Sequence, residues 1–159
     1  MDLFRLYLLP CLFAFLAGAA FCFIFNLRGR MLVLAPLGAA VGWLAYLLAA
    51  PLSGDISRSF VATLAAAAYG EVMARVCKQP ATGFILVGLL PFVPGGGIYY
   101  TMEHCIAGEI DLFITTGIHT LGVAGALAAG VLLVSSFMRL WGAARHHFRR
   151  TLSHKGGST

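Results

Sequence analysis

Residues 81–102, ATGFILVGLLPFVPGGGIYYTM, set the class of fold to expect. They are almost all apolar, and a helix needs about 20 such residues to cross the hydrocarbon core of a bilayer. Pro91 and Pro94 each remove a backbone donor, and three glycines leave the backbone after them free to unwind. The sequence therefore predicts a transmembrane helix that is broken at this Pro/Gly run. The three glycines are Gly95, Gly96 and Gly97.

Backbone groups freed by a break in the bilayer need partners, and lipid offers none. Irregular backbone at membrane depth occurs where it is buried in protein or lines an aqueous cavity, and broken helices of transporters aim their dipoles at a ligand. A kinked helix packed for structural reasons is the alternative, but two prolines with three glycines favour a break that faces a ligand or gates a pathway. Tyr99, Tyr100 and Thr101 follow the break. Their hydroxyls are donors to a polar solute, or else the tyrosines belong to an aromatic belt at the outer interface.

The remainder of the chain is also apolar. Of its 159 residues, 60% are hydrophobic and only 11% are charged, against about 25% charged residues in a typical soluble domain. Because nothing alternates as a barrel strand would, we predict an all-α integral membrane protein, a bundle of five transmembrane helices. Its transmembrane domain covers residues 1–138. The predicted spans are about 3–25, 31–52, 56–77, 81–102 and 112–138.

Basic residues predict the orientation of this bundle. Nine of the eleven Lys and Arg residues lie in the first and third loops or in a basic tail over residues 139–159. The positive-inside rule therefore places the N-terminus outside and the C-terminus in the cytoplasm. A cleaved signal peptide is the alternative for the first segment, but Asp2 offsets Arg5, and the apolar run exceeds the usual ~7–15 residues. The tail is expected to anchor the chain beside anionic lipid headgroups and not to bind nucleic acid.

Ionisable residues within the predicted spans are candidates for a transport site. Glu71 lies about six residues from the cytoplasmic end of its helix, and Arg75 follows it by one turn on the same face. They are either a proton- or substrate-binding site or an ion pair that reaches the interface. His119 lies near Thr116 and Thr120 in the fifth span. It is either part of a polar stripe facing the bundle or a satisfied interior histidine.

Other patterns bear on chemistry and packing. The cysteines and histidines lack metal-ligand spacing, and no motif of a hydrolase or metalloenzyme occurs. We therefore expect no enzymatic activity, no catalytic residue, no metal and no cofactor. Small residues such as Gly38 and Gly42 predict close helix packing or an oligomer contact.

In their order along the chain, these segments resemble the threonine/serine exporter family, specifically its short five-span half. The resemblance implies an exporter of the bacterial inner membrane that is driven by the proton-motive force. Its substrates would be hydroxy amino acids such as threonine and serine, or small dicarboxylates such as succinate. The segments that carry the resemblance are FCFIFNLRGRMLVLAPLGAAVGWLAYLL (21–48), FVATLAAAAYGEVMARV (60–76) and, most specifically, PFVPGGGIYYTM (91–102).

The resemblance also implies a partner, because this half occurs either fused to a larger half or as a separate small subunit. We therefore expect a separately encoded large subunit as the partner. A homo-oligomer of this chain is a second possible assembly. By carry-over, Pro91, Pro94, Gly95 and Tyr99 or Tyr100 are expected at the substrate pathway, whereas Glu71 and His119 rest on membrane depth alone. The alternative function is a membrane subunit that assembles or stabilises such a complex without transporting anything itself.

Overall fold

The computed structural model of the chain describes residues 4–52 and 54–155, with side chains described as far as residue 142. Within these residues all regular structure is helical. A π-helical turn, η1 (Phe4–Leu8), leads into the first helix, and a 3-10 turn, η2 (Leu90–Phe92), separates the fourth from the fifth. The α-helices are α1 (Leu9–Ile24), α2 (Met31–Leu48), α3 (Asp55–Cys77), α4 (Ala81–Leu89), α5 (Gly95–Ala107) and α6 (Ile110–Lys155).

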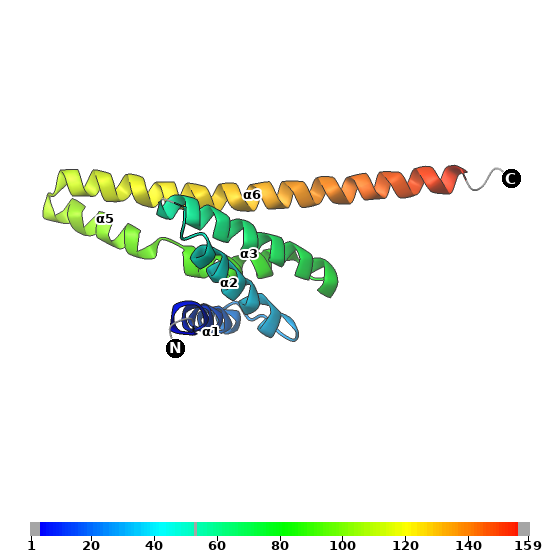
Figure 1. Ribbon diagram of the computed structural model, residues 1–159, viewed down its shortest axis with the longest axis horizontal. Coiled ribbons are helices and arrows are strands. Elements are labelled where there is room, and N and C mark those ends of the chain that lie inside the picture. The colour runs from blue at the N-terminus through cyan, green and yellow to red at the C-terminus, as the bar shows by residue number, and fades with distance from the viewer. Residues whose placement is uncertain (1–3, 53, 156–159) are drawn as a thin grey trace.

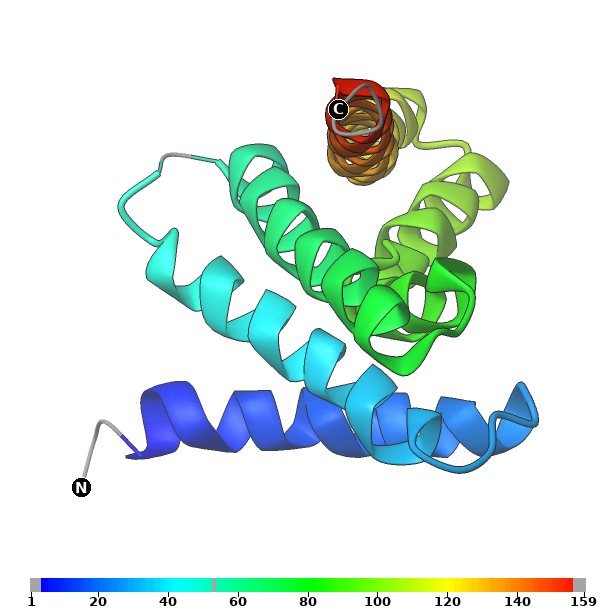
Figure 2. The same cartoon turned by 90° about the vertical axis from the view of Figure 1, so that its right-hand side faces the viewer.

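The helices fan out from α1 to α6. In Figure 1 the long α6 runs across the molecule above α3, while α1 is seen almost end on. Figure 2 looks along α6 and shows α1 lying across the view, with α2 and α3 at intermediate tilts. Each helix packs against its neighbours in this fan: α1 on α2, α2 on α3 and α4, and α3 on α4 and α6. The short α5 packs chiefly against α6.

The length and composition of the helices make this a multi-pass membrane protein. Four helical segments among the described residues are long and apolar enough to cross a bilayer: Phe4–Ile24, Met31–Leu48, Asp55–Cys77 and Ile110–Gly142. A fifth is counted if Ala81–Phe92 and Gly95–Ala107, which are bent by 51° with respect to each other, form one span. The all-helical membrane class predicted from the sequence is confirmed, and the number of spans lies between four and five.

Several helix ends differ from the predicted boundaries, and the fourth predicted span continues past residue 102 to Ala107. The second helix ends at Leu48 instead of residue 52, because Pro51 has no N–H to donate to Leu47, and the chain tightens into turns before it. The last helix starts at Ile110 and continues to Lys155. The basic segment predicted as a tail from residue 139 therefore extends the same helix, since no proline interrupts it.

Small residues bring α2, α3 and α4 into close contact. A Cβ atom built on Gly42 would lie 2.9 Å from the ring of Phe92 and 3.0 Å from Ala66 Cβ. Similarly, a Cβ on Gly70 would meet Ile85 at 3.0 Å. The close packing predicted from the small residues is thus found within the chain, where van der Waals contact replaces the hydrophobic effect as the driving force.

Candidate functional site

The Pro/Gly run lies between α4 and α5 and has few regular hydrogen bonds. The N–H of Val93 donates to the Leu90 carbonyl at 3.3 Å, and the N–H of Gly95 donates to the Val93 carbonyl at 2.7 Å. Pro94 precedes α5, and no side chain caps the helix. The first turn of a helix leaves its N–H groups without intrahelical partners. The start of α5 therefore presents backbone donors and the positive end of a helix dipole.

A cavity of about 220 Å³ lies beside this run, at the end of the bundle where α2 ends and α3 begins. It is smaller than the ~300–1,000 Å³ pockets that hold drug-sized ligands, so its size suits a small metabolite. Four segments of the fold contribute to its wall. The lining residues are Trp43 and Tyr46 from α2, Asp55 and Ser59 from α3, Pro91, Phe92, Pro94 and Gly97 from the Pro/Gly run, and His119, Thr120 and Val123 from α6.

Three aromatic rings form one wall of the cavity. Trp43 stacks on Tyr46 at a centroid distance of 5.5 Å and on Phe92 at 5.6 Å. Phe92 is buried, which fixes the 3-10 turn against α2. The indole Nε1 of Trp43 is buried and has no hydrogen-bond partner among the described residues. The wall is thus made of packed aromatic rings, with one buried donor, Trp43 Nε1, that has no partner among the described residues.

Polar groups also line or adjoin the cavity. The Tyr46 hydroxyl donates a hydrogen bond to Asp55, across the connection between α2 and α3. The guanidinium of Arg58 lies over the Tyr46 ring, 4.3 Å from its centroid, a cation–π geometry. Ser59 is buried, and Thr120 donates to the backbone of its own helix at 2.7 Å. Carboxylate, hydroxyl and imidazole groups therefore surround one small volume.

The structure brings together only some of the residues predicted from the sequence. Pro91, Pro94, Gly97 and His119 line the cavity, and His119 is exposed. Thr120, predicted to share a polar helix face with His119, lines it too. The polar stripe of the fifth span therefore faces the Pro/Gly run.

The other residues that the sequence predicts at the substrate pathway lie outside the cavity lining. Positions of Cβ atoms built on Gly95 and Gly96 have nothing within 4 Å. Tyr99 and Tyr100 are exposed and pack edge to face, with centroids 5.4 Å apart. Thr101 donates to the Gly97 carbonyl at 2.6 Å within α5. These positions surround the start of α5 without contributing to the cavity wall.

Glu71 and Arg75 lie in a different part of α3. The Arg75 Nη2 is 3.8 Å from the Glu71 carboxylate and donates to the Met138 carbonyl of α6 at 2.8 Å. Ser59 and Glu71 are separated by about 18 Å along the helix, at 1.5 Å per residue. The structure therefore does not bring this pair to His119. The hydrogen bond from Arg75 to Met138 connects α3 with α6.

Trp43, Tyr46, Asp55 and Ser59 were not recognised from the sequence. Trp43 and Tyr46 are three positions apart and so share a helix face, which is the one signal that relates them. Asp55 directly precedes the predicted third span, and nothing in the sequence relates it to the Pro/Gly run. Among the described residues, no group of three or more His, Cys, Asp or Glu side chains has the geometry to hold a metal ion.

The family described as threonine/serine exporter, ThrE, has a sequence model that matches residues 10–137 of the chain. The matched stretch begins in α1 and ends in α6, and it includes every residue that lines the cavity. No curated protein and no solved structure matches the chain.

Proposed function

Because the chain belongs to the threonine/serine exporter family, we propose that it exports a small polar metabolite through the cavity beside the Pro/Gly run. Family membership makes the chain a membrane transport protein and not an enzyme. The observation that carries the proposal is the cavity itself, where irregular backbone meets polar groups from three other helices. Irregular backbone of this kind lines the ligand sites of many transporters.

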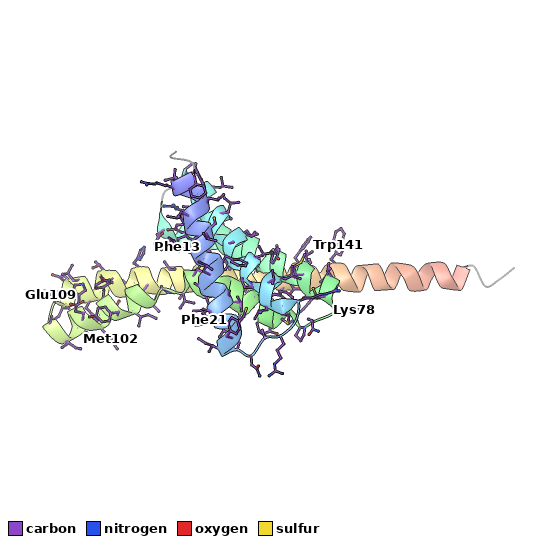
Figure 3. The ribbon with its side chains drawn as sticks, turned by 90° about the horizontal axis from the view of Figure 1, so that it is seen from below. Phe13, Phe21, Lys78, Met102, Glu109 and Trp141 are labelled. Carbon is purple, nitrogen blue, oxygen red and sulfur yellow. The ribbon has the colours of Figure 1, made fainter. Side chains whose placement is uncertain are left out.

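The proposed orientation has the N-terminus outside and α4, η2 and α5 forming one broken span of five. Figure 3 places Lys78 and Trp141 toward one end of the long axis and Glu109 at the other. Basic and aromatic residues at the first end suit the cytoplasmic interface. The cavity then lies toward the outer side of a bacterial inner membrane.

The cavity is better matched to a zwitterionic amino acid than to a dicarboxylate. Asp55 offers a carboxylate to an ammonium group, and the start of α5 offers N–H donors to a carboxylate. Ser59 and Thr120 add hydroxyls suited to a hydroxylated side chain. None of the described lining residues is a lysine or an arginine, so succinate would meet no permanently charged cation for its second carboxylate. Threonine and serine are therefore the proposed substrates.

The proposed exporter is proton-driven and works beside a separately encoded large subunit, in one or several copies. Support for both comes from the resemblance to the short half of the family. Of the ionisable residues named from the sequence, His119 alone lines the cavity. We therefore propose that Glu71 and Arg75 form a structural ion pair between α3 and α6.

Export by cells of the source organism tests the proposal. Strains carrying this chain alone, the large subunit alone, or both are loaded with labelled threonine, serine or succinate, and efflux is measured. We expect efflux of the amino acids only with both chains. Ser59→Ala is expected to change the ratio of threonine to serine efflux, while Ser135→Ala, about 18 Å along α6 from the cavity lining, leaves it unchanged. Variants that alter assembly with unchanged selectivity would instead favour a non-transporting subunit.

A further inference from the structure

We propose that Asp55 couples export to proton entry: its one carboxylate binds the ammonium group of the substrate or a proton, and never both. This inference rests on the proposed function, since it takes a zwitterion as the occupant of the cavity. It adds a residue that the Pro/Gly run and the sequence-predicted ionisable positions do not include.

The position of Asp55 gives its carboxylate access to both the cavity and the surrounding medium. It is the first residue of α3, its side chain is exposed, and it lines the cavity together with Ser59 of the next turn. Among the described lining residues it is the only Asp or Glu. Any cation that enters the cavity therefore has one carboxylate to bind.

Within the part of the chain that the structure describes, no cationic side chain forms an ion pair with Asp55. Among the described residues, no Lys, Arg or His nitrogen lies within 4.0 Å of its carboxylate. Arg58, one turn later in α3, is held against the face of Tyr46 instead. The Tyr46 hydroxyl donates one hydrogen bond to the carboxylate, and an ionised carboxylate has about four acceptor positions. Acceptor positions therefore remain for an ammonium group.

The other titratable or charged groups around the cavity do not duplicate this role. Tyr46 from α2 and Arg58 from α3 flank Asp55, and His119 lines the cavity from α6. Arginine and protonated histidine repel an ammonium group, and tyrosine is a neutral donor here. The residues of η2 and α5 that line the cavity carry no titratable side chain. Competition between substrate and proton is therefore confined to Asp55.

The exchange balances in atoms and charge. The ionised carboxylate accepts hydrogen bonds from the substrate ammonium group while the cavity is reached from the cytoplasm. When the cavity opens outward, the zwitterion leaves and one proton from the outer medium converts the carboxylate to the neutral acid. After the return step the proton leaves to the cytoplasm. One proton enters for each zwitterion exported, so one positive charge moves inward per cycle.

Inverted membrane vesicles from the source organism, carrying the whole complex, test the proposal. Labelled threonine is supplied outside, and an acidic lumen provides the gradient. We expect wild-type vesicles to accumulate threonine. In threonine exchange, lowering the pH on both sides should raise the half-saturating concentration, approaching about tenfold per pH unit at the acidic limit, without lowering the maximal rate. Asp55→Asn should reduce gradient-driven accumulation to the level of vesicles lacking the chain.

Matched variants separate coupling from folding. Asp55→Glu should restore accumulation with a shifted pH profile. Asp111→Asn, also in the first turn of a helix but outside the cavity lining, should behave as wild type. Accumulation retained by Asp55→Asn would overturn the proposal. Loss of transport in both Asp55 variants, at normal protein levels in the membrane, would also overturn it by making the residue structural.

Wild-type results distinguish this inference from the proposed function. Threonine and serine transport that ignores the proton gradient would reject the coupling role alone. Wild-type vesicles that transport neither amino acid, with the large subunit present, would reject the proposed function itself.

Discussion

Gly97 is the position where the fold leaves least room for a side chain near the cavity. A Cβ atom added there would lie 2.5 Å from Thr120 Oγ1 and 3.2 Å from its Cγ2. Thr120 is buried and its hydroxyl donates to the Thr116 carbonyl at 2.7 Å. Because both γ atoms of a β-branched residue are held, rotation offers no relief. Gly97→Ala should therefore push α5 away from α6, its main contact.

The size of the effect follows from two opposing terms. Overpacking of this kind typically costs about 1–3 kcal/mol, whereas Ala is favoured over Gly in a helix by about 0.8–1.0 kcal/mol. Gly96→Ala gains the second term without the first, since nothing lies within 4 Å of its Cβ position. The two variants should therefore differ by the clash alone, about 5- to 150-fold in the population of the packed α5–α6 arrangement.

Threonine efflux from complemented deletion cells, normalised to protein in the membrane, measures this difference. We expect Gly97→Ala to reduce efflux well below both wild type and Gly96→Ala. The double variant Gly97→Ala/Thr120→Ala removes both clashing γ atoms and should recover most of the loss, which a double-mutant cycle quantifies. Equal efflux from the two single glycine variants would show that the contact between α5 and α6 does not matter for transport.

Further substitutions test other contacts. Phe92→Ala removes a buried ring and should destabilise the protein by about 3–5 kcal/mol. The midpoint of thermal unfolding in detergent should fall, and an unchanged midpoint would contradict the role of Phe92 in the cavity wall. Arg75→Met loses the hydrogen bond to Met138 and should cost about 1 kcal/mol with an unchanged half-saturating threonine concentration; a changed concentration would place the residue in the transport cycle. Tyr46→Phe removes the donor to Asp55 and should raise that concentration about 2- to 10-fold, and no rise would leave the hydroxyl without a role in binding.

Part of the cavity lining consists of residues that composition and local chemistry single out in the sequence. The Pro/Gly run was identified because proline lacks a donor and glycine lacks a Cβ, and both effects act on the residue's own backbone. The polar face of Thr116, His119 and Thr120 was predicted from helical periodicity, which is also local. Of these positions, Pro91, Pro94, Gly97, His119 and Thr120 line the cavity, whereas Thr116 does not.

Tyr46 and Asp55 show why the remaining part was missed. In the sequence, Tyr46 lies near the end of the second predicted span and Asp55 lies just before the third. Nothing in the sequence relates either residue to Pro91. They meet the Pro/Gly run because small residues let α2, α3 and α4 approach closely, so that the Phe92 ring lies against Gly42. Conversely, Glu71 has the membrane depth expected of a transport site, but its position on α3 leaves it about 18 Å along the helix from the cavity.

Hydropathy alone was enough to establish a helical membrane protein, because in lipid each helix must satisfy its backbone hydrogen bonds within itself. Each helix meets this requirement on its own, so each helix can be predicted from the hydropathy of its own segment of sequence. The cavity depends on the tilts of the helices and on how closely they approach one another, which arise from contacts between residues far apart in the chain. The tertiary structure was therefore needed to join Trp43, Asp55 and His119 with the Pro/Gly run in one site.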